Sequence, residues 1–123
     1  MDAKKPFGLI VEDDPDLSNI FSEAINAAGF ETEIVLNGRQ ALERLKDVIP
    51  QLVILDMHLP EVSGRDILAY IRSEDRFGKT IVVVSTADAL MGEEMRDMAD
   101  FVLIKPITFA QLRDMSARLK PAV

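Results

Sequence analysis

The sequence predicts an α/β fold in which five helices cover both faces of a five-stranded parallel sheet. Short runs that are apolar at nearly every position recur along the chain, and they are typical of strands buried on both faces of a parallel sheet. Segments with apolar residues at helical spacing separate these runs. This alternation of strand and helix predicts right-handed crossovers, with helices packed on each side of the sheet.

Length and composition limit the number of domains, the chemistry and the location that this chain can have. The 123 residues suffice for one domain with one core, so we expect a single domain over residues 1–123 and no output domain in this chain. Cysteine is absent, which excludes disulfides and thiolate chemistry. No apolar run reaches transmembrane length, and the N-terminus lacks the apolar core of a signal peptide, so we expect a cytoplasmic protein that does not insert into membranes.

The charge balance is acidic, with 21 acidic against 14 basic residues and a formal net charge of −7. A module that binds the nucleic-acid backbone needs a basic face, so direct binding of nucleic acid is not expected. An acidic chain is compatible with a bound cation or with a partner that presents a basic surface.

The first strand is expected at Phe7–Val11, and the acidic residues Glu12 and Asp13 follow it. Asp14 suits the N-cap of a helix that ends before Gly29, where glycine readily adopts the left-handed conformation that terminates helices. The predicted inner face of this helix consists of Leu17, Ile20, Phe21, Ala24, Ile25 and Ala28.

The next segments predict an edge strand, a helix and a central strand. Glu31–Leu36 alternates only partly, as edge strands do, and Asn37-Gly38 turns into the second helix. The predicted inward residues of that helix are Ala41, Leu42, Leu45 and Val48. The run Leu52–Leu55 then ends abruptly at Asp56, which should stand at the mouth of a crevice beyond the carboxyl end of a central strand.

A loop from Pro60 to Gly64 leads into the third helix, which Ser63 can cap. The fourth strand is expected at Thr80–Val84, and it ends in Ser85-Thr86. A weaker helix pattern follows over residues 88–98, and we expect it to be short. The predicted inner residues of these two helices are Ile67, Leu68 and Ile71, and then Leu90, Met91, Met95 and Met98.

The fifth strand is expected at Phe101–Ile104 and ends at Lys105-Pro106. Thr108 and Gln111 have the spacing of a capping box, which marks the start of the last helix. The predicted buried residues of that helix are Phe109, Leu112, Met115 and Leu119.

Four of the predicted strands end in polar residues, and in a parallel sheet these ends lie at the same edge. Closely packed carboxylates repel, so they imply a bound cation or raised pKa values. Oxygen ligands alone favour magnesium or a similar hard cation. A divalent cation and a lysine can neutralise a phosphoryl group during transfer, and a carboxylate can accept that group covalently.

This combination resembles the receiver domain of two-component response regulators, the family of the bacterial chemotaxis regulator. The resemblance covers roughly residues 7–119 and implies a doubly wound, flavodoxin-like sheet with strand order 2-1-3-4-5. The motifs that carry it are Glu12-Asp13, the loop Asp56-Met57-His58-Leu59-Pro60 with Gly64, Thr86-Ala87, and Lys105-Pro106.

The resemblance implies that Asp56 is the phospho-acceptor and that the cofactor is Mg²⁺. Asp13 would bind the metal directly and Glu12 mainly through water, while Asp56 and the backbone carbonyl of His58 would complete the protein ligands. The His58 side chain is expected to be exposed rather than to bind the metal.

The resemblance also assigns roles at the fourth and fifth strands. Thr86 would form a hydrogen bond with the phosphoryl group, Lys105 would pair with its charge, and the Lys105–Pro106 bond would be cis, as only X-Pro bonds readily are. Most receivers carry an aromatic switch residue three positions before the lysine, where this chain has Val102. Phe101 is adjacent, but neighbouring strand residues point to opposite faces, so it cannot simply substitute.

The implied function is phosphoryl transfer from a sensor histidine kinase or a histidine phosphotransfer protein, which would then alter binding of a downstream effector protein. Such a receiver promotes its own phosphorylation and hydrolysis but is not an enzyme with an external substrate; homodimerisation is left open. One alternative is a receiver-like binding module that is never phosphorylated, which the missing aromatic residue favours. Another is an aspartyl-phosphate hydrolase of the haloacid-dehalogenase type, which would need an aspartate at position 58, where this chain has His58.

Overall fold

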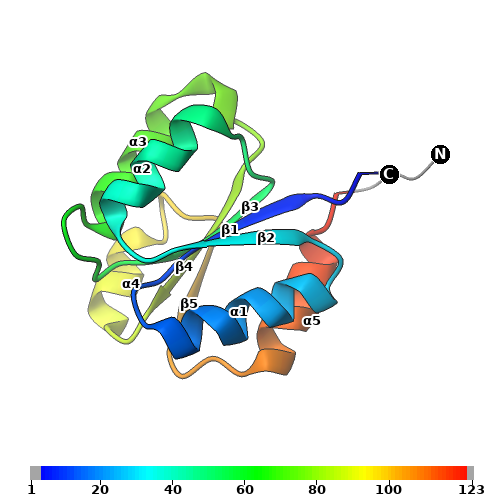
Figure 1. Ribbon diagram of the computed structural model, residues 1–123. Helices are drawn as coiled ribbons and strands as arrows, with labels where there is room; N and C mark the ends of the chain where they lie inside the picture. Colours follow the sequence, from blue (N-terminus) through cyan, green and yellow to red (C-terminus); the bar gives the residue numbers. More distant parts are fainter. Residues whose placement is uncertain (1–3, 122–123) are drawn as a thin grey trace.

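The computed structural model describes residues 4–121, and its centre is a parallel sheet of five strands in the order β2-β1-β3-β4-β5 (Figure 1). The strands are β1 (Phe7–Val11), β2 (Glu31–Val35), β3 (Leu52–Asp56), β4 (Ile81–Thr86) and β5 (Phe101–Ile104). The helices are α1 (Pro15–Ala27), α2 (Gly38–Asp47), α3 (Gly64–Ser73), α4 (Ala89–Met95) and α5 (Phe109–Leu119), with a short 3₁₀ turn η1 at Asp75–Phe77. The predicted fold class and strand order are confirmed.

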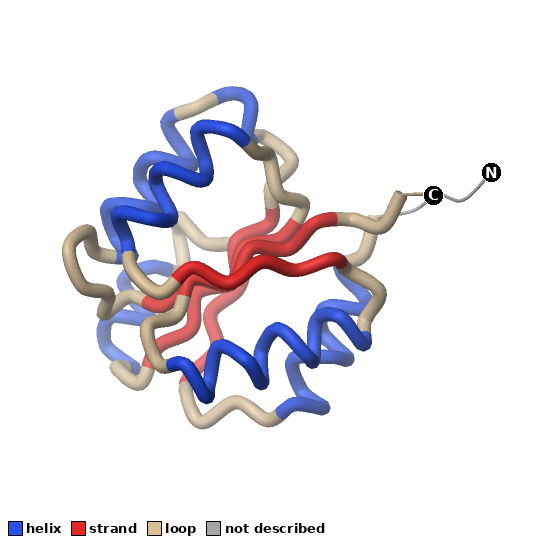
Figure 2. The backbone as a smooth tube through the Cα atoms, viewed as in Figure 1, coloured by secondary structure: helices blue, strands red, loops and turns tan. Residues whose placement is uncertain are grey.

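Helices lie on both faces of the sheet (Figure 2), and on each face a layer of buried hydrophobic side chains packs between the helices and the strands. Alternate residues of a strand face opposite sides, so Leu9 packs under α2, α3 and α4, whereas its neighbour Ile10 packs under α1 and α5. All five residues of β3 are buried, as expected for the central strand of a sheet covered on both faces. Within residues 4–121, no helix combines the length and the apolar character that crossing a membrane requires.

The helix boundaries follow the predicted capping signals. The Asp14 carboxylate accepts hydrogen bonds from the backbone N–H groups of the first turn of α1, and the Ser63 hydroxyl accepts one from the first turn of α3. Thr108 and Gln111 form the reciprocal capping box at the start of α5. Gly29, which follows α1, has a φ of +104°, a conformation that glycine adopts without steric cost.

Three residues predicted to face inward are exposed instead. Ile20 of α1 is 42% exposed, Phe109 of α5 is 37% exposed and Leu90 of α4 is 77% exposed. A helix that covers a sheet buries only a narrow stripe, and residues at the edge of that stripe remain in contact with water. The helix α4 has only seven residues, so Met95 is its one buried methionine, and Met98 lies beyond its end.

Candidate functional site

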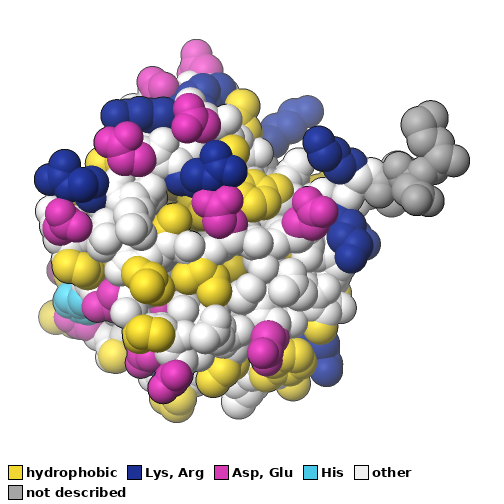
Figure 3. Space-filling view, viewed as in Figure 1, with side chains coloured by type: hydrophobic (Ala, Val, Ile, Leu, Met, Phe, Trp, Pro, Cys, Tyr) yellow, Lys and Arg dark blue, Asp and Glu magenta, His cyan; other side chains and the backbone are white. Residues whose placement is uncertain are grey.

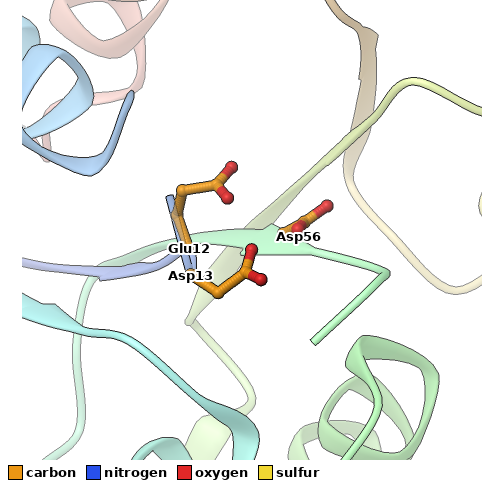
Figure 4. Close-up of side chains that lie close together, drawn as sticks. All are labelled: Glu12, Asp13 and Asp56. Atoms are coloured by element: carbon orange, nitrogen blue, oxygen red, sulfur yellow. The ribbon is translucent and has the colours of Figure 1, made fainter. Parts of the chain in front are cut away.

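Three carboxylates meet at the edge of the sheet where β1 and β3 end (Figure 4). Glu12 and Asp13 directly follow β1, and Asp56 is the last residue of β3, which is the strand next to β1. One carboxylate oxygen from each residue lies within 4.8 Å of the others. Glu12 and Asp56 are buried while Asp13 is exposed, so the group is open to solvent on one side. The structure therefore brings together the three carboxylates that the sequence predicted to converge.

Lys105 provides the positive charge at this edge. Its ammonium Nζ donates a hydrogen bond to Glu12 Oε1 at 2.7 Å and lies 3.6 Å from Asp56 Oδ1. The other oxygen of Glu12, Oε2, accepts from the backbone N–H of Asp14 at 3.2 Å. The buried carboxylate of Glu12 is thus compensated by an ammonium and a backbone amide. The bond between Lys105 and Pro106 is cis, as the resemblance implied.

Burial dominates the electrostatics of the two inner carboxylates. It raises the pKa of Asp56, against the opposing effects of the Lys105 charge and the backbone N–H of His58. It also raises the pKa of Glu12, and the hydrogen bond from Lys105 offsets part of that effect. Burial acts to lower the pKa of Lys105, but the hydrogen bond to Glu12 and the charge of Asp56 outweigh it and raise the pKa. The site consequently favours a second positive charge beside these carboxylates.

Thr86, the last residue of β4, is completely buried and is connected to α4. Its hydroxyl oxygen accepts a hydrogen bond of 3.0 Å from the backbone N–H of Asp88, the residue that caps α4. A Cβ placed on Gly92 of that helix would lie 3.3 Å from the methyl carbon of Thr86 and 3.0 Å from Val102 Cγ1. The helix α4 therefore packs closely on Thr86 and Val102, at the side of the sheet where an aromatic switch residue is usual.

The loop after Asp56 folds tightly because of two glycines. A Cβ on Gly64 would lie 2.1 Å from the backbone oxygen of Asp56, and a Cβ on Gly38 would lie 1.8 Å from the backbone oxygen of Val62. Neither position accepts a side chain without movement of the backbone. His58 lies in this loop and its side chain is exposed, as predicted.

Two features of this loop have no local signal in the sequence. The sequence predicts Gly38 only as a turn residue before α2, and nothing local indicates that it contacts the loop through Val62. Glu61 has a φ of +70°, and its carboxylate pairs with Arg39 Nε at 3.0 Å. A glutamate gives no sequence signal for a left-handed conformation, which asparagine or glycine would have given.

Comparison with protein families identifies the family to which a chain with this site belongs. The model of the response regulator receiver domain matches residues 9–117. The chain belongs to the response regulator receiver family. Receiver domains act in two-component signalling as partners of histidine kinases, and they are signalling proteins rather than conventional enzymes. The chain is accordingly a phosphoryl-accepting receiver with an acidic cation site.

Individual relatives agree with the family match. The polar-differentiation response regulator DivK of Brucella anthropi is 35% identical over 88 residues, which cover 72% of each chain. The DNA-binding response regulator MtrA of Mycolicibacterium smegmatis is 33% identical over 110 residues, which cover 86% of this receiver but only 46% of MtrA. The chain thus spans about half the length of that DNA-binding relative.

A solved structure of similar fold contains a metal. The receiver domain of the sensor histidine kinase PA1611 from Pseudomonas aeruginosa superposes with a TM-score of 0.82 over 95% of this chain and 98% of that one, at 23% identity. That structure has a magnesium ion coordinated in its active-site cleft.

One face of the receiver carries side chains of both charges. On the face shown in Figure 3, acidic and basic side chains are interspersed and form no continuous basic patch. This face therefore provides no basic stripe of the kind that tracks a phosphate backbone.

Proposed function

We propose that Asp56 is the residue of this receiver that accepts the phosphoryl group. The observation that carries the proposal is the grouping of one buried aspartate, two further carboxylates and one ammonium at the carboxyl edge of the sheet. Asp56 is the member of the cluster at the end of the central strand, and both Asp13 and Lys105 lie beside it. A carboxylate in this position can act as a nucleophile toward phosphorus.

The donor in this proposal is a phosphorylated histidine of a partner kinase or of a histidine phosphotransfer protein. An oxygen of Asp56 forms a bond to phosphorus while the phosphorus–nitrogen bond of the phosphohistidine breaks, and the electron pair of that bond stays on the imidazole. Lys105 Nζ, already 3.6 Å from Asp56 Oδ1, pairs with the transferred group. The Thr86 hydroxyl can accept from Asp88 and still donate to a phosphoryl oxygen, because a hydroxyl does both.

Magnesium fits the chemistry of the cluster. The ligands available are carboxylate oxygens, which Mg²⁺ prefers, and the exposed side of Asp13 leaves a path from solvent. Asp13 and Asp56 would hold the ion directly, Glu12 would act mainly through water, and the backbone carbonyl of His58 would complete the protein ligands. When bound, magnesium supplies positive charge that stabilises the transferring phosphoryl oxygens. The ion in the PA1611 receiver supports the same choice of metal.

The output of the proposed switch is a change in the surface formed by α4 and β5. Three apolar side chains of this region are exposed, namely Leu90, Phe101 and Ile104. They offer a downstream effector protein an apolar contact area whose arrangement depends on the position of α4. Phosphorylation would then act on Thr86, Thr86 would act on α4, and the position of α4 would decide which partner binds.

Intact mass measured after incubation with acetyl phosphate and magnesium tests the assignment. We expect the mass to increase by one phosphoryl group in the wild type, and the increase to disappear in Asp56→Asn or when magnesium is chelated. Asp47→Asn, which changes an exposed aspartate at the end of α2, is the matched control and should be phosphorylated normally. Equal phosphorylation of the wild type and Asp56→Asn would contradict the proposal.

A further inference from the structure

Ser85, the residue before Thr86, has a buried hydroxyl with no hydrogen-bond partner. Its side chain is completely buried, and over residues 4–121 only one other buried side-chain polar atom, the hydroxyl of Ser116, shares this condition. A buried hydroxyl without a partner costs free energy that alanine at the same position would not. The position of Ser85 indicates what compensates for this cost.

The strand register places Ser85 beside Asp56. Ser85 pairs with Asp56 across β3 and β4, and with Leu103 across β4 and β5. Registered residues of parallel strands point to the same face of the sheet, so the Ser85 and Asp56 side chains are neighbours on one face. Lys105 follows Leu103 by two residues and therefore continues on that face as well.

The Lys105 side chain reaches across the strand that carries Ser85. Lys105 follows β5, yet its ammonium bonds to Glu12 after β1, and the two strands between them are β4 and β3. The Lys105 side chain therefore spans β4 and β3 at the edge of the sheet where Ser85 and Asp56 lie side by side. In the unphosphorylated receiver the Lys105 ammonium donates its hydrogen bond to Glu12 at 2.7 Å, and the Ser85 hydroxyl oxygen has no donor.

We propose that Ser85 is a positioning residue for Lys105 in the phosphorylated state. This inference rests on the proposed phosphorylation of Asp56. A phosphoryl group adds a charge of about −1.5 to −2, which exceeds that of the Glu12 carboxylate and draws the ammonium toward β3. That movement brings Nζ back toward β4, where one of its three N–H groups donates to the Ser85 hydroxyl oxygen while another donates to the phosphoryl group.

A serine at this position thus lowers the stability of the resting receiver and stabilises the phosphorylated form. Beryllofluoride, a phosphoryl mimic that binds noncovalently with magnesium, allows affinity to be measured at equilibrium. We expect Ser85→Ala to melt at the same or a higher temperature than the wild type without ligand, and to bind beryllofluoride about fivefold more weakly, a factor that corresponds to one ordinary hydrogen bond. Ser85→Thr, which keeps the hydroxyl, should restore most of the affinity.

Ser116→Ala is the matched control because it removes the other buried, unpartnered hydroxyl. Ser116 lies eight residues after the cap of α5, about 12 Å along the helix and away from the site. We expect it to raise the melting temperature without changing the affinity for beryllofluoride. A purely structural role of Ser85 would make the two alanine variants behave alike.

A double-mutant cycle with Lys105→Ala tests the route of the effect. In the Lys105→Ala background, Ser85→Ala should cause no further loss of affinity. Wild-type affinity in Ser85→Ala, or a full fivefold loss in both backgrounds, would overturn the inference. If the wild type itself binds no beryllofluoride, or binds it as well when Asp56 is replaced by asparagine, the proposed function fails and the role of Ser85 fails with it. Normal wild-type binding with an unaffected Ser85→Ala rejects only the role of Ser85.

Discussion

Asp13→Asn should stabilise the receiver in the absence of magnesium and abolish the stabilisation that magnesium provides. Asp13 lies within 4.8 Å of two other carboxylates, and Lys105 is the ammonium paired with them. Removal of its charge relieves repulsion in the metal-free protein. The same change removes the only exposed carboxylate of the cluster, which is the one that an incoming cation meets first.

The size of the effect can be worked out from the spacing. Two unit charges 4.8 Å apart repel by about 0.9 kcal/mol in bulk water and by about 3.5 kcal/mol at an effective dielectric constant of 20. Because Asp13 is exposed, the lower value applies to each of its two neighbours, which amounts to about 1–2 kcal/mol in the free energy of unfolding. For a domain of this size each 1 kcal/mol corresponds to about 3–5 °C in melting temperature.

Thermal unfolding with and without magnesium measures both effects. A magnesium concentration 100 times the dissociation constant should stabilise the wild type by about 2.7 kcal/mol and should leave Asp13→Asn unchanged. Glu23→Gln, which removes an exposed charge from α1, controls for the change in net charge and should keep the full response to magnesium. A lower melting temperature of metal-free Asp13→Asn, together with the wild-type response to magnesium, would refute the reasoning.

Three other substitutions test separate parts of the site. Lys105→Ala leaves the buried Glu12 carboxylate without its ammonium, so we expect urea titrations to show a loss of about 1–3 kcal/mol, of which magnesium should restore a part. His58→Lys adds a charge to an exposed loop position two residues after Asp56, and the decay of the phosphorylated protein measured by intact mass should change several-fold; identical decay rates would show that the side chain faces away from the site. Val102→Tyr introduces a ring where Gly92 already packs closely, so overpacking should cost about 1–3 kcal/mol in thermal unfolding, and an unchanged melting temperature would show that space for a ring exists.

The fold could be predicted because its determinants are local. The strand at Phe7–Val11 and the strand at Phe101–Ile104 were predicted with the bounds that the structure shows, since each apolar run is bordered by a charged residue or a proline. The caps of α1, α3 and α5 were also evident, because the interaction of a cap with its own first turn depends on residues two or three positions apart. The convergence of the carboxylates then follows from parallel strands alone.

Features that depend on distant contacts were not predictable in the same way. The exposure of Leu90 depends on how much of α4 the sheet can cover, and the sequence of a short helix does not contain that information. The hydrogen bond from Lys105 to Glu12 spans 93 positions in the chain; strand order brings the two to one edge, but only the structure shows that Lys105 is nearer to Glu12 than to Asp56. For the same reason the contact of Gly38 with Val62 had no sequence signal.

The packing around Thr86 explains how a receiver without an aromatic switch residue can still couple its site to α4. The Thr86 hydroxyl bonds to the N–H of Asp88, and Asp88 in turn caps α4 through hydrogen bonds to the N–H groups of Leu90 and Met91. On the other side of the same residue, the methyl group faces Gly92, where the absence of a Cβ lets the helix approach the sheet. Any displacement of Thr86 toward a group on Asp56 therefore acts on α4 at its cap and at its closest contact with the sheet. In the proposed switch the backbone of a short helix would take the part that a rotating ring has elsewhere, and the stiff Val102 side chain would serve as a fixed surface against which the helix moves.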